Sequence, residues 1–235
     1  YRGLLGHKSV LTGTSLQNPW HQVHKQTLRW VEASKAAGKP WVVANDEQNP
    51  AGQGVPPDPG YQGFDGWGTD PEFGKYNLHH IRKYTLWGNL MAGGAGVEYY
   101  FGYGLPENDL IAEDYRSRDK SWEYCGYAIH FFHENKIPFW QMRNRNELVG
   151  NTDASNTRFC LGKENEVYVI YLLEGGSTDI DLSEASGTFA VKWYNPREGG
   201  NLHNGSVKQI RAGGKVSVGN PPEDAEEDWV VLLSK

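Results

Sequence analysis

The fold is decided by the stretch KPWVVANDEQNP, residues 39–50. Its first part, Pro40–Ala44, is a five-residue apolar run, which is typical of a strand buried on both faces of a parallel sheet. Asn45, Asp46 and Glu47 follow it directly. Because functional residues of parallel α/β sheets and barrels collect where strands end, these polar groups are the first candidates for a site. The alternative is a loop cap at Asp46 and a solvated Glu47.

The residues on either side of this run predict further strands and helices. A strand at Val10–Leu16 leads to Asn18 as a helix N-cap, with Pro19 at the first helical position. Three strand–helix units in sequence predict parallel strands with crossover helices. The first expected helix stops at Lys35 and Gly38, and one of its faces is formed by Trp20, Val23, Thr27, Trp30, Val31 and Ser34. A second helix is expected from Tyr76 to Met91, with a stop at Gly93 and Gly94, and a strand at Gly96–Phe101 follows it. The third expected helix has the face Trp122, Cys125, Ile129 and Phe132.

The chain changes character near residue 137, and this change predicts a second domain. From Phe139 onward the apolar runs are short and are bounded by Gly, Asn, Asp, Pro or Ser, which is typical of a β-sandwich. We therefore expect an α/β domain over 1–137 and an all-β domain over 138–235. The expected strands are Arg158–Gly162, Val167–Leu173, Thr178–Leu182, Thr188–Trp193, Val207–Arg211, Lys215–Val218 and Trp229–Leu233.

Composition excludes several classes of protein. The 235 residues carry a formal charge of −6, which argues against nucleic-acid binding. No apolar run approaches the roughly 18 residues of a membrane helix, so we expect no membrane partner. Only Cys125 and Cys160 are available for a disulfide, which excludes a disulfide-stapled scaffold. The opening YRGLLGHKSVL lacks the basic and apolar segments of a signal peptide, and we expect a mature product, a shortened chain or a fragment.

A carboxylate and several aromatic residues lie near the third predicted strand and the loop before the second helix. Glu98 lies among apolar and aromatic residues, so we expect it to be buried and paired. Its candidate partners are Arg82, Arg116 and Arg118, and a structural ion pair is the alternative to a catalytic role. Carboxylates beside flat aromatic faces suit sugar rings, although some of these aromatics must belong to the core. The aromatic residues in question are Tyr61, Phe64, Trp67, Phe73, Tyr76, Tyr103 and Tyr115.

Other motifs carry little chemistry. The Gly- and Pro-rich stretch from Gln48 to Gly74 is long for a structureless connection, and such loops are usually functional or disordered. The histidine pairs 79–80 and 21/24 lack zinc-ligand spacing, so we expect no metal and no cofactor. There is no GxSxG for an esterase and no GxxxxGK[ST] for a nucleotide phosphate. The acidic run Glu223–Asp228 lacks calcium-ligand spacing.

Five stretches of the chain show a family resemblance. KPWVVANDEQNP (39–50), HHIRKYTLWGNLMAGGAGVEYYFGYG (79–104) and DYRSRDKSWEYC (114–125) resemble the C-terminal part of a bacterial family of glycoside hydrolases with a (β/α)8 barrel. VKWYNPREGG (191–200) and DWVVLL (228–233) are similar to the β-sandwich that follows this barrel and is commonly called a collagen-binding domain. The resemblance implies strands six to eight of a TIM barrel, followed by a β-sandwich.

The resemblance also implies a site. Glu47 matches the nucleophile at the end of strand seven, with Asp46 as its main rival. Glu98 and Tyr99, at the end of strand eight, are expected to orient Glu47 or the sugar, and Trp67 and Tyr103 to contact the sugar. Retaining hydrolysis needs two carboxylates about 5–5.5 Å apart, and the acid/base belongs to strand four, which lies outside these residues.

The expected partners follow from the same resemblance. They are a carbohydrate substrate, a polysaccharide or extracellular matrix ligand, and the N-terminal part of the barrel, in a secreted or periplasmic protein. Without that part of the barrel, we expect the chain to lack hydrolase activity and to expose the sheet edge at the first strand. The alternatives are a non-catalytic carbohydrate- or matrix-binding protein with a degenerate barrel, and a sandwich with a purely structural role.

Overall fold

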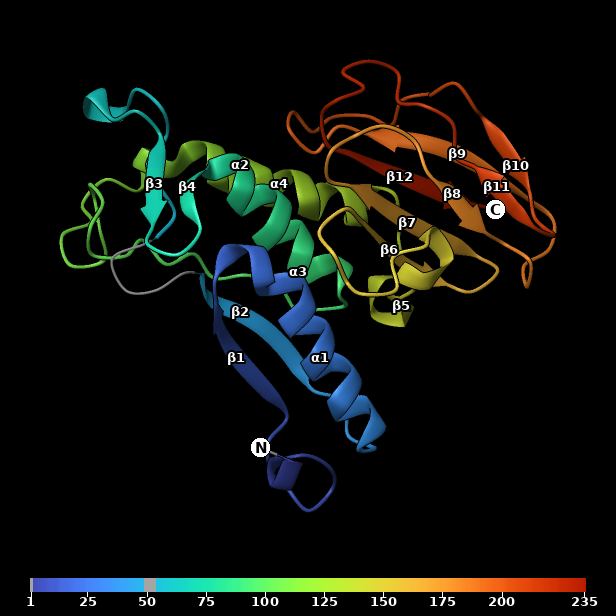
Figure 1. The fold of residues 1–235 in the computed structure, drawn as a ribbon, viewed down its shortest axis with the longest axis horizontal. Coiled ribbons are helices and arrows are strands. Elements are labelled where there is room, and N and C mark those ends of the chain that lie inside the picture. Colours follow the sequence, from blue (N-terminus) through green and yellow to red (C-terminus); the bar gives the residue numbers. More distant parts are fainter. Residues whose placement is uncertain (1, 49–53) are drawn as a thin grey trace. The chain divides into compact units, whose positions relative to one another are not determined.

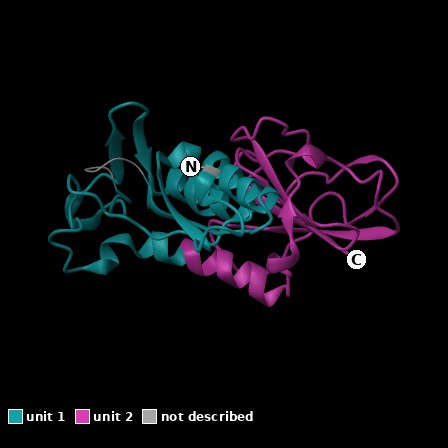
Figure 2. Cartoon of the chain, turned by 90° about the horizontal axis from the view of Figure 1, so that it is seen from below, with its two compact units in different colours: residues 1–123 teal, residues 124–235 magenta. Residues whose placement is uncertain are grey.

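Two units make up the fold in the computed structural model, residues 1–123 and 124–235 (Figure 2). The structure describes residues 2–48 and 54–235, and part of the expected functional loop, 49–53, lies outside the described residues. Helix α4 (Asp119–Glu134) contributes residues to both units. The first unit mixes helices with parallel strands, whereas the second is built mainly of antiparallel strands.

The parallel strands of the first unit surround the run at residues 40–44. β1 (Gly13–Asn18) and β2 (Val42–Gln48) pair in parallel, and α1 (Val23–Ala36) connects them, as the strand–helix pattern predicts (Figure 1). Val43 is buried and packs in the cluster that α1 covers. Val42 beside it is 62 % exposed, so the expectation of two buried faces is wrong. Helix α1 covers one face of this strand, and no described element buries Val42 on the other.

A third parallel segment lies along β2 and is shorter than expected. Asn45 and Val97 form a single parallel bridge, and the Ala95 N–H donates to the Val43 carbonyl at 2.8 Å. The predicted strand Gly96–Phe101 therefore reduces to one bridge. After it, the backbone turns to bond the side chain of Gln48 instead of the strand ladder.

The start of the first helix also differs from the prediction. β1 begins at Gly13, not at Val10, and extends to Asn18. Asn18 is thus a strand residue and caps no helix. Pro19 is extended, with φ −53° and ψ 140°, and precedes a 3₁₀ turn at Trp20–Gln22. The helix stop is confirmed, since α1 ends before a glycine with φ +81°.

The stretch expected as a loop contains a hairpin, and the second helix is divided. β3 (Trp67–Asp70) and β4 (Gly74–Asn77) pair antiparallel. The helix then runs as α2 (Leu78–His80), a π-helical turn (Ile81–Leu86) and α3 (Trp87–Met91).

This second helix begins two residues later than expected. Tyr76 belongs to β4, and Asn77 is the N-cap, because its side chain accepts from the His79 and His80 N–H groups at 3.0 and 3.3 Å. The predicted stop is confirmed at Gly93, which has a positive φ of 79°.

The first unit should lose stability as the pH falls, because of one buried histidine. His24 on α1 is fully buried, and its Nδ1 lies 2.9 Å from the Gly88 carbonyl of α3. Burial lowers the pKa of His24 from 6.5 to about 4. The unfolded chain therefore binds a proton at His24 near pH 6.5, whereas the folded chain binds it only near pH 4. The free energy of unfolding should therefore fall by roughly 3 kcal/mol as the pH drops from 6.5 to 4.

Urea denaturation between pH 7 and pH 4 checks this prediction. His24→Gln should flatten the pH dependence of the first unit, whereas the exposed His130→Gln should leave it unchanged. An identical slope in the wild-type chain and in His24→Gln would contradict the role of His24.

Helix α4 is present, but its buried face is not the predicted one. The buried positions include Tyr124, Ala128 and Phe131, whereas Trp122 and Ile129 are exposed. The buried stripe is shifted by one residue, or about 100° around the helix. Both stripes are rich in aromatic side chains, so periodicity alone does not distinguish them.

The second unit contains all seven predicted strands. They form a six-stranded antiparallel sheet in the order β10-β9-β12-β7-β6-β5 and a two-stranded sheet β11-β8 (Figure 1). β5 was not predicted, because two residues are too short for a periodic pattern. The strands are β5 (Arg143–Asn144), β6 (Arg158–Lys163), β7 (Val167–Leu172), β8 (Asp179–Asp181), β9 (Thr188–Tyr194), β10 (Gln209–Arg211), β11 (Lys215–Ser217) and β12 (Trp229–Ser234).

A single apolar core joins the two sheets of this unit. Trp193, Trp229 and Ile170 from the large sheet pack in one cluster with Ile180 from β8. Every residue of β7 is buried, so this strand is covered on both faces. On its other face, the Tyr171 hydroxyl donates to a buried carboxylate of Asp228 at 2.6 Å.

Candidate functional site

The polar residues after the apolar run lie inside β2, which continues to Gln48. The pairing with β1 shifts register so that Asp46 is the extra residue of a β-bulge. A bulge changes the direction in which the following side chains point. Asn45 is fully buried, Asp46 is half-buried and Glu47 is exposed at the end of the strand. Of the two rival carboxylates, Glu47 is therefore the more accessible.

Tyr100 lies close enough to Glu47 for the carboxylate charge to act on it, and Tyr103 packs against Tyr100. The Tyr100 and Tyr103 rings meet edge to face, with centroids 6.0 Å apart. Burial raises the pKa of Tyr100 above 10, and the negative charges of Asp109 and Glu47 add to this effect. The structure thus links Glu47 to Tyr100, a residue that the sequence did not indicate, and Tyr103 contacts Tyr100. Strand alternation gave no signal for this pair, because Tyr100 and Tyr103 are three residues apart and would lie on opposite faces of an extended chain.

Gln48 holds this neighbourhood in place and was also missed. Its Nε2 donates to the Tyr100 carbonyl at 2.6 Å, and its Oε1 accepts from the Tyr100 N–H at 3.4 Å. Gln48 is fully buried. A buried amide directly after two carboxylates was the available signal, because such an amide needs both a donor and an acceptor.

Glu98 differs from its expectation, because it is exposed. Its backbone N–H still donates to the Asn45 carbonyl of β2 at 3.0 Å, while its side chain lies in solvent. Two of its expected cation partners lie elsewhere: Arg116 pairs with Asp114 at 2.9 Å, and the buried Arg118 donates to the Val55 carbonyl at 3.1 Å. Arg82, the third, lies 2.8 Å from a His79 nitrogen.

Tyr99 and Trp67 belong to other aromatic groups. The Tyr99 ring lies 5.7 Å from Trp122 and packs beside the cluster of Val55, Tyr76 and Ile81. Trp67 on β3 is 40 % exposed, and its ring lies 6.2 Å from His80.

Of the seven aromatic residues considered for the sugar site, Tyr76 belongs to the core, in line with the alternative that some of them are core residues. It is fully buried, and its hydroxyl donates to the Gly54 carbonyl at 2.6 Å.

Some kinds of site find no support in the described residues. Within residues 2–48 and 54–235, no group of three or more His, Cys, Asp or Glu side chains is placed to hold a metal. None of the helices in these ranges has the length and apolar character to cross a bilayer. Neither Cys125 nor Cys160 is part of a disulfide, and burial raises the pKa of Cys160.

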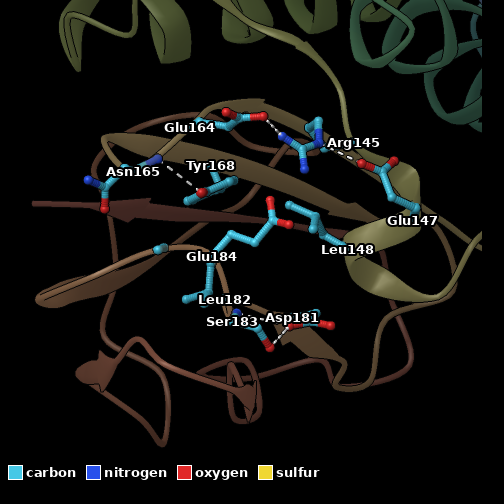
Figure 3. Close-up of a pocket in the computed structure, with 11 residues that line it drawn as sticks. Arg145, Glu147, Leu148, Glu164, Asn165, Tyr168, Asp181, Leu182, Ser183 and Glu184 are labelled. Atoms are coloured by element: carbon cyan, nitrogen blue, oxygen red, sulfur yellow. Dashed lines mark hydrogen bonds and ion pairs between the residues drawn. The ribbon is translucent and has the colours of Figure 1, made fainter.

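The second unit contains a pocket of about 350 Å³ between the β5–β6 region and the segment 181–185 (Figure 3). Arg145 on its wall pairs with Glu147 at 2.5 Å and with Glu164. Ser183 donates from its N–H and its hydroxyl to Asp181, at 2.9 and 2.5 Å.

Comparison with protein families matches the second unit. Residues 144–234 match the model described as "Putative collagen-binding domain of a collagenase". The resemblance found in VKWYNPREGG and DWVVLL is confirmed. No curated protein matches the chain.

Solved structures match the fold of both units. One is a glycoside hydrolase family 5 protein from Bacteroides vulgatus ATCC 8482, with a TM-score of 0.65 and 19 % identity over 100 % of this chain and 53 % of that one. Another is described as a glycoside hydrolase, with a TM-score of 0.60 and 16 % identity over 88 % of this chain and 45 % of that one. The chain thus spans about half the length of the structures it matches. At these identities the likeness concerns the fold alone.

Proposed function

We propose that this chain is the C-terminal part of a retaining glycoside hydrolase. In this proposal residues 1–137 supply strands six to eight of a (β/α)8 barrel, and residues 138–235 form an accessory β-sandwich. The observation that carries the proposal is the exposed Glu47 at the end of a parallel strand, close enough to Tyr100 for its charge to act on that tyrosine. The fold likeness to glycoside hydrolases supports it.

The chemistry assigns a role to each group. A Glu47 carboxylate oxygen attacks the anomeric carbon, and the bond from that carbon to the leaving oxygen breaks. A second carboxylate, on the part of the barrel outside this chain, protonates the leaving oxygen and later activates water. Tyr103 and Trp67 offer exposed rings for the sugar, while Asp46, Glu98 and Tyr99 contribute the remaining contacts. No cofactor takes part.

Covalent trapping tests this function in a protein that contains this chain and the rest of the barrel. A 2-deoxy-2-fluoro glycoside with a dinitrophenolate leaving group needs no protonation of that group. It should leave a glycosyl ester on Glu47, which mass spectrometry of the proteolysed protein locates. An ester on Asp46 would move the nucleophile by one residue, and hydrolysis without any trapped ester would contradict a retaining mechanism.

A binding role for the second unit is the second candidate. The family match over residues 144–234 favours it, because the description of that family names collagen binding. In this case the chain belongs to an extracellular protein that adheres to a polysaccharide or matrix protein. Binding by the second unit, combined with no hydrolysis by the complete barrel, would favour this candidate over the first.

A further inference from the structure

We propose that the pocket of the second unit binds the side chain of a lysine or arginine from a protein ligand. The pocket lies between Arg145–Leu148, the turn at Glu164 and Asn165, and the segment 181–185 (Figure 3). The assignment goes beyond glycoside hydrolysis and does not depend on Glu47, which belongs to the other unit.

The polar wall of the pocket requires a guest that donates hydrogen bonds. Arg145 is the single basic residue among the described residues that line it, and Glu147 and Glu164 already engage its guanidinium. Arg143, outside the lining, also pairs with Glu164, so Asp181 and Glu184 are the lining carboxylates that no arginine of the described residues engages. Four carboxylates line the pocket in all, and ionised carboxylates only accept hydrogen bonds. These carboxylates are Glu147, Glu164, Asp181 and Glu184.

Two of the lining carboxylates, Asp181 and Glu164, are stabilised in their ionised form by their neighbours. The two hydrogen bonds from Ser183 lower the pKa of Asp181. The guanidinium groups of Arg143 and Arg145 lower the pKa of Glu164. Since Glu147 and Glu164 are already paired with arginines, Asp181 and Glu184 carry the negative charge that would attract a cationic guest.

The rest of the lining is apolar and defines the shape of the guest. Leu148 and Ala185 are only partly buried and pack on the core of the unit, while Leu182 is buried below them. Figure 3 shows the Glu184 side chain extended across the pocket toward Leu148. An aliphatic stem can therefore lie on the leucine surface while its charged tip reaches the carboxylates. Lysine and arginine have this construction.

The distribution of the carboxylates disfavours a metal ion. A hard cation such as Ca²⁺ needs several oxygen ligands at 2.3–2.6 Å from one point. Among the described residues, no group of three carboxylates, histidines or cysteines meets that need. The negative groups instead line a volume of about 350 Å³, which suits an extended organic cation.

The test is a titration of the whole chain with small peptide probes, followed by amide NMR. The probes are acetyl-lysine-amide, acetyl-arginine-amide and, as an uncharged isostere, acetyl-norleucine-amide. We expect the two cationic probes to shift amides of 145–148 and 181–185 and the norleucine probe to bind at least about threefold more weakly. The double variant Asp181→Asn and Glu184→Gln should weaken lysine binding about tenfold.

A matched control separates the pocket from overall charge. Glu226→Gln removes one exposed carboxylate of the same unit outside the pocket and should leave lysine binding unchanged. The proposal is overturned if norleucine binds as well as lysine, if Glu226→Gln weakens lysine binding as much as Glu184→Gln, or if the shifts fall outside the pocket. Displacement of lysine by millimolar CaCl₂, but not by equal ionic strength of NaCl, would also overturn it, in favour of a metal site.

Discussion

Replacing Glu47 with glutamine should reduce kcat/KM of the complete barrel for a glycoside by on the order of 10⁴-fold. The neutral amide cannot attack the anomeric carbon, so the loss should appear in kcat. Folding should be unaffected, because Glu47 is exposed and no hydrogen bond to its side chain holds the described fold together. Steady-state kinetics together with thermal unfolding of both proteins measures the two effects.

Two further variants make this result specific. Asp46→Asn should retain most of the activity, since Asp46 is the half-buried residue of the bulge. Glu47→Ala in the presence of azide should form a glycosyl azide: the carbon–nitrogen bond forms as the bond to the leaving group breaks. Undiminished turnover in Glu47→Gln would falsify the assignment, and loss of turnover in Asp46→Asn alone would transfer the role to Asp46.

Replacing Gly54 with alanine should destabilise the first unit by about 2–4 kcal/mol. A Cβ on Gly54 would lie 1.9 Å from the carbonyl carbon of Phe101, and backbone atoms cannot move aside as a flexible side chain does. The displaced segment would strain three hydrogen bonds: Tyr76 hydroxyl to Gly54 carbonyl, Val55 N–H to Tyr100 carbonyl at 2.8 Å, and Arg118 Nε to Val55 carbonyl.

Gly126→Ala is the matched control for this clash. Nothing lies within 4 Å of the Cβ position at Gly126, which is inside α4, so alanine should be neutral or stabilising by up to about 1 kcal/mol. Hydrogen exchange measured by mass spectrometry should show faster exchange at Val55 and around Gly102 in Gly54→Ala only. Equal unfolding free energies for the two variants would contradict the prediction, because they would mean that the segments at Gly54 and Phe101 can move apart without loss of stability.

The second unit was the more predictable of the two. Its strands each carry a short apolar run with turn residues at both ends, so their positions follow from local sequence. Their order in the sheet does not, because β12 pairs with β7 and β9 from distant parts of the chain. Asp181 and Ser183 lie at such a turn, but their meeting with Arg145 across the pocket was not predictable, since the segments are distant in sequence.

The first unit was predicted in outline and missed in detail. The parallel pair and its helix followed from periodicity. The strand position of Asn18, the buried face of α4 and the exposure of Glu98 did not. Each of these errors concerns the direction of a side chain or the exact end of an element. Such features depend on which neighbour covers a face, and local spacing does not contain that information.

The sequence alone was enough to predict the parallel pair with its connecting helix, the seven longer strands of the second unit, the acidic balance of the chain and the place of Asp46 and Glu47 at the end of a strand. The bulge at Asp46 that leaves Glu47 exposed, the hydrogen bonds from Gln48 to the Tyr100 backbone and the pocket lined by four carboxylates of the second unit became visible only in the folded chain. The physical reason is that periodicity acts between near neighbours in the chain, whereas register, burial and pocket chemistry arise from segments that meet only in the folded protein.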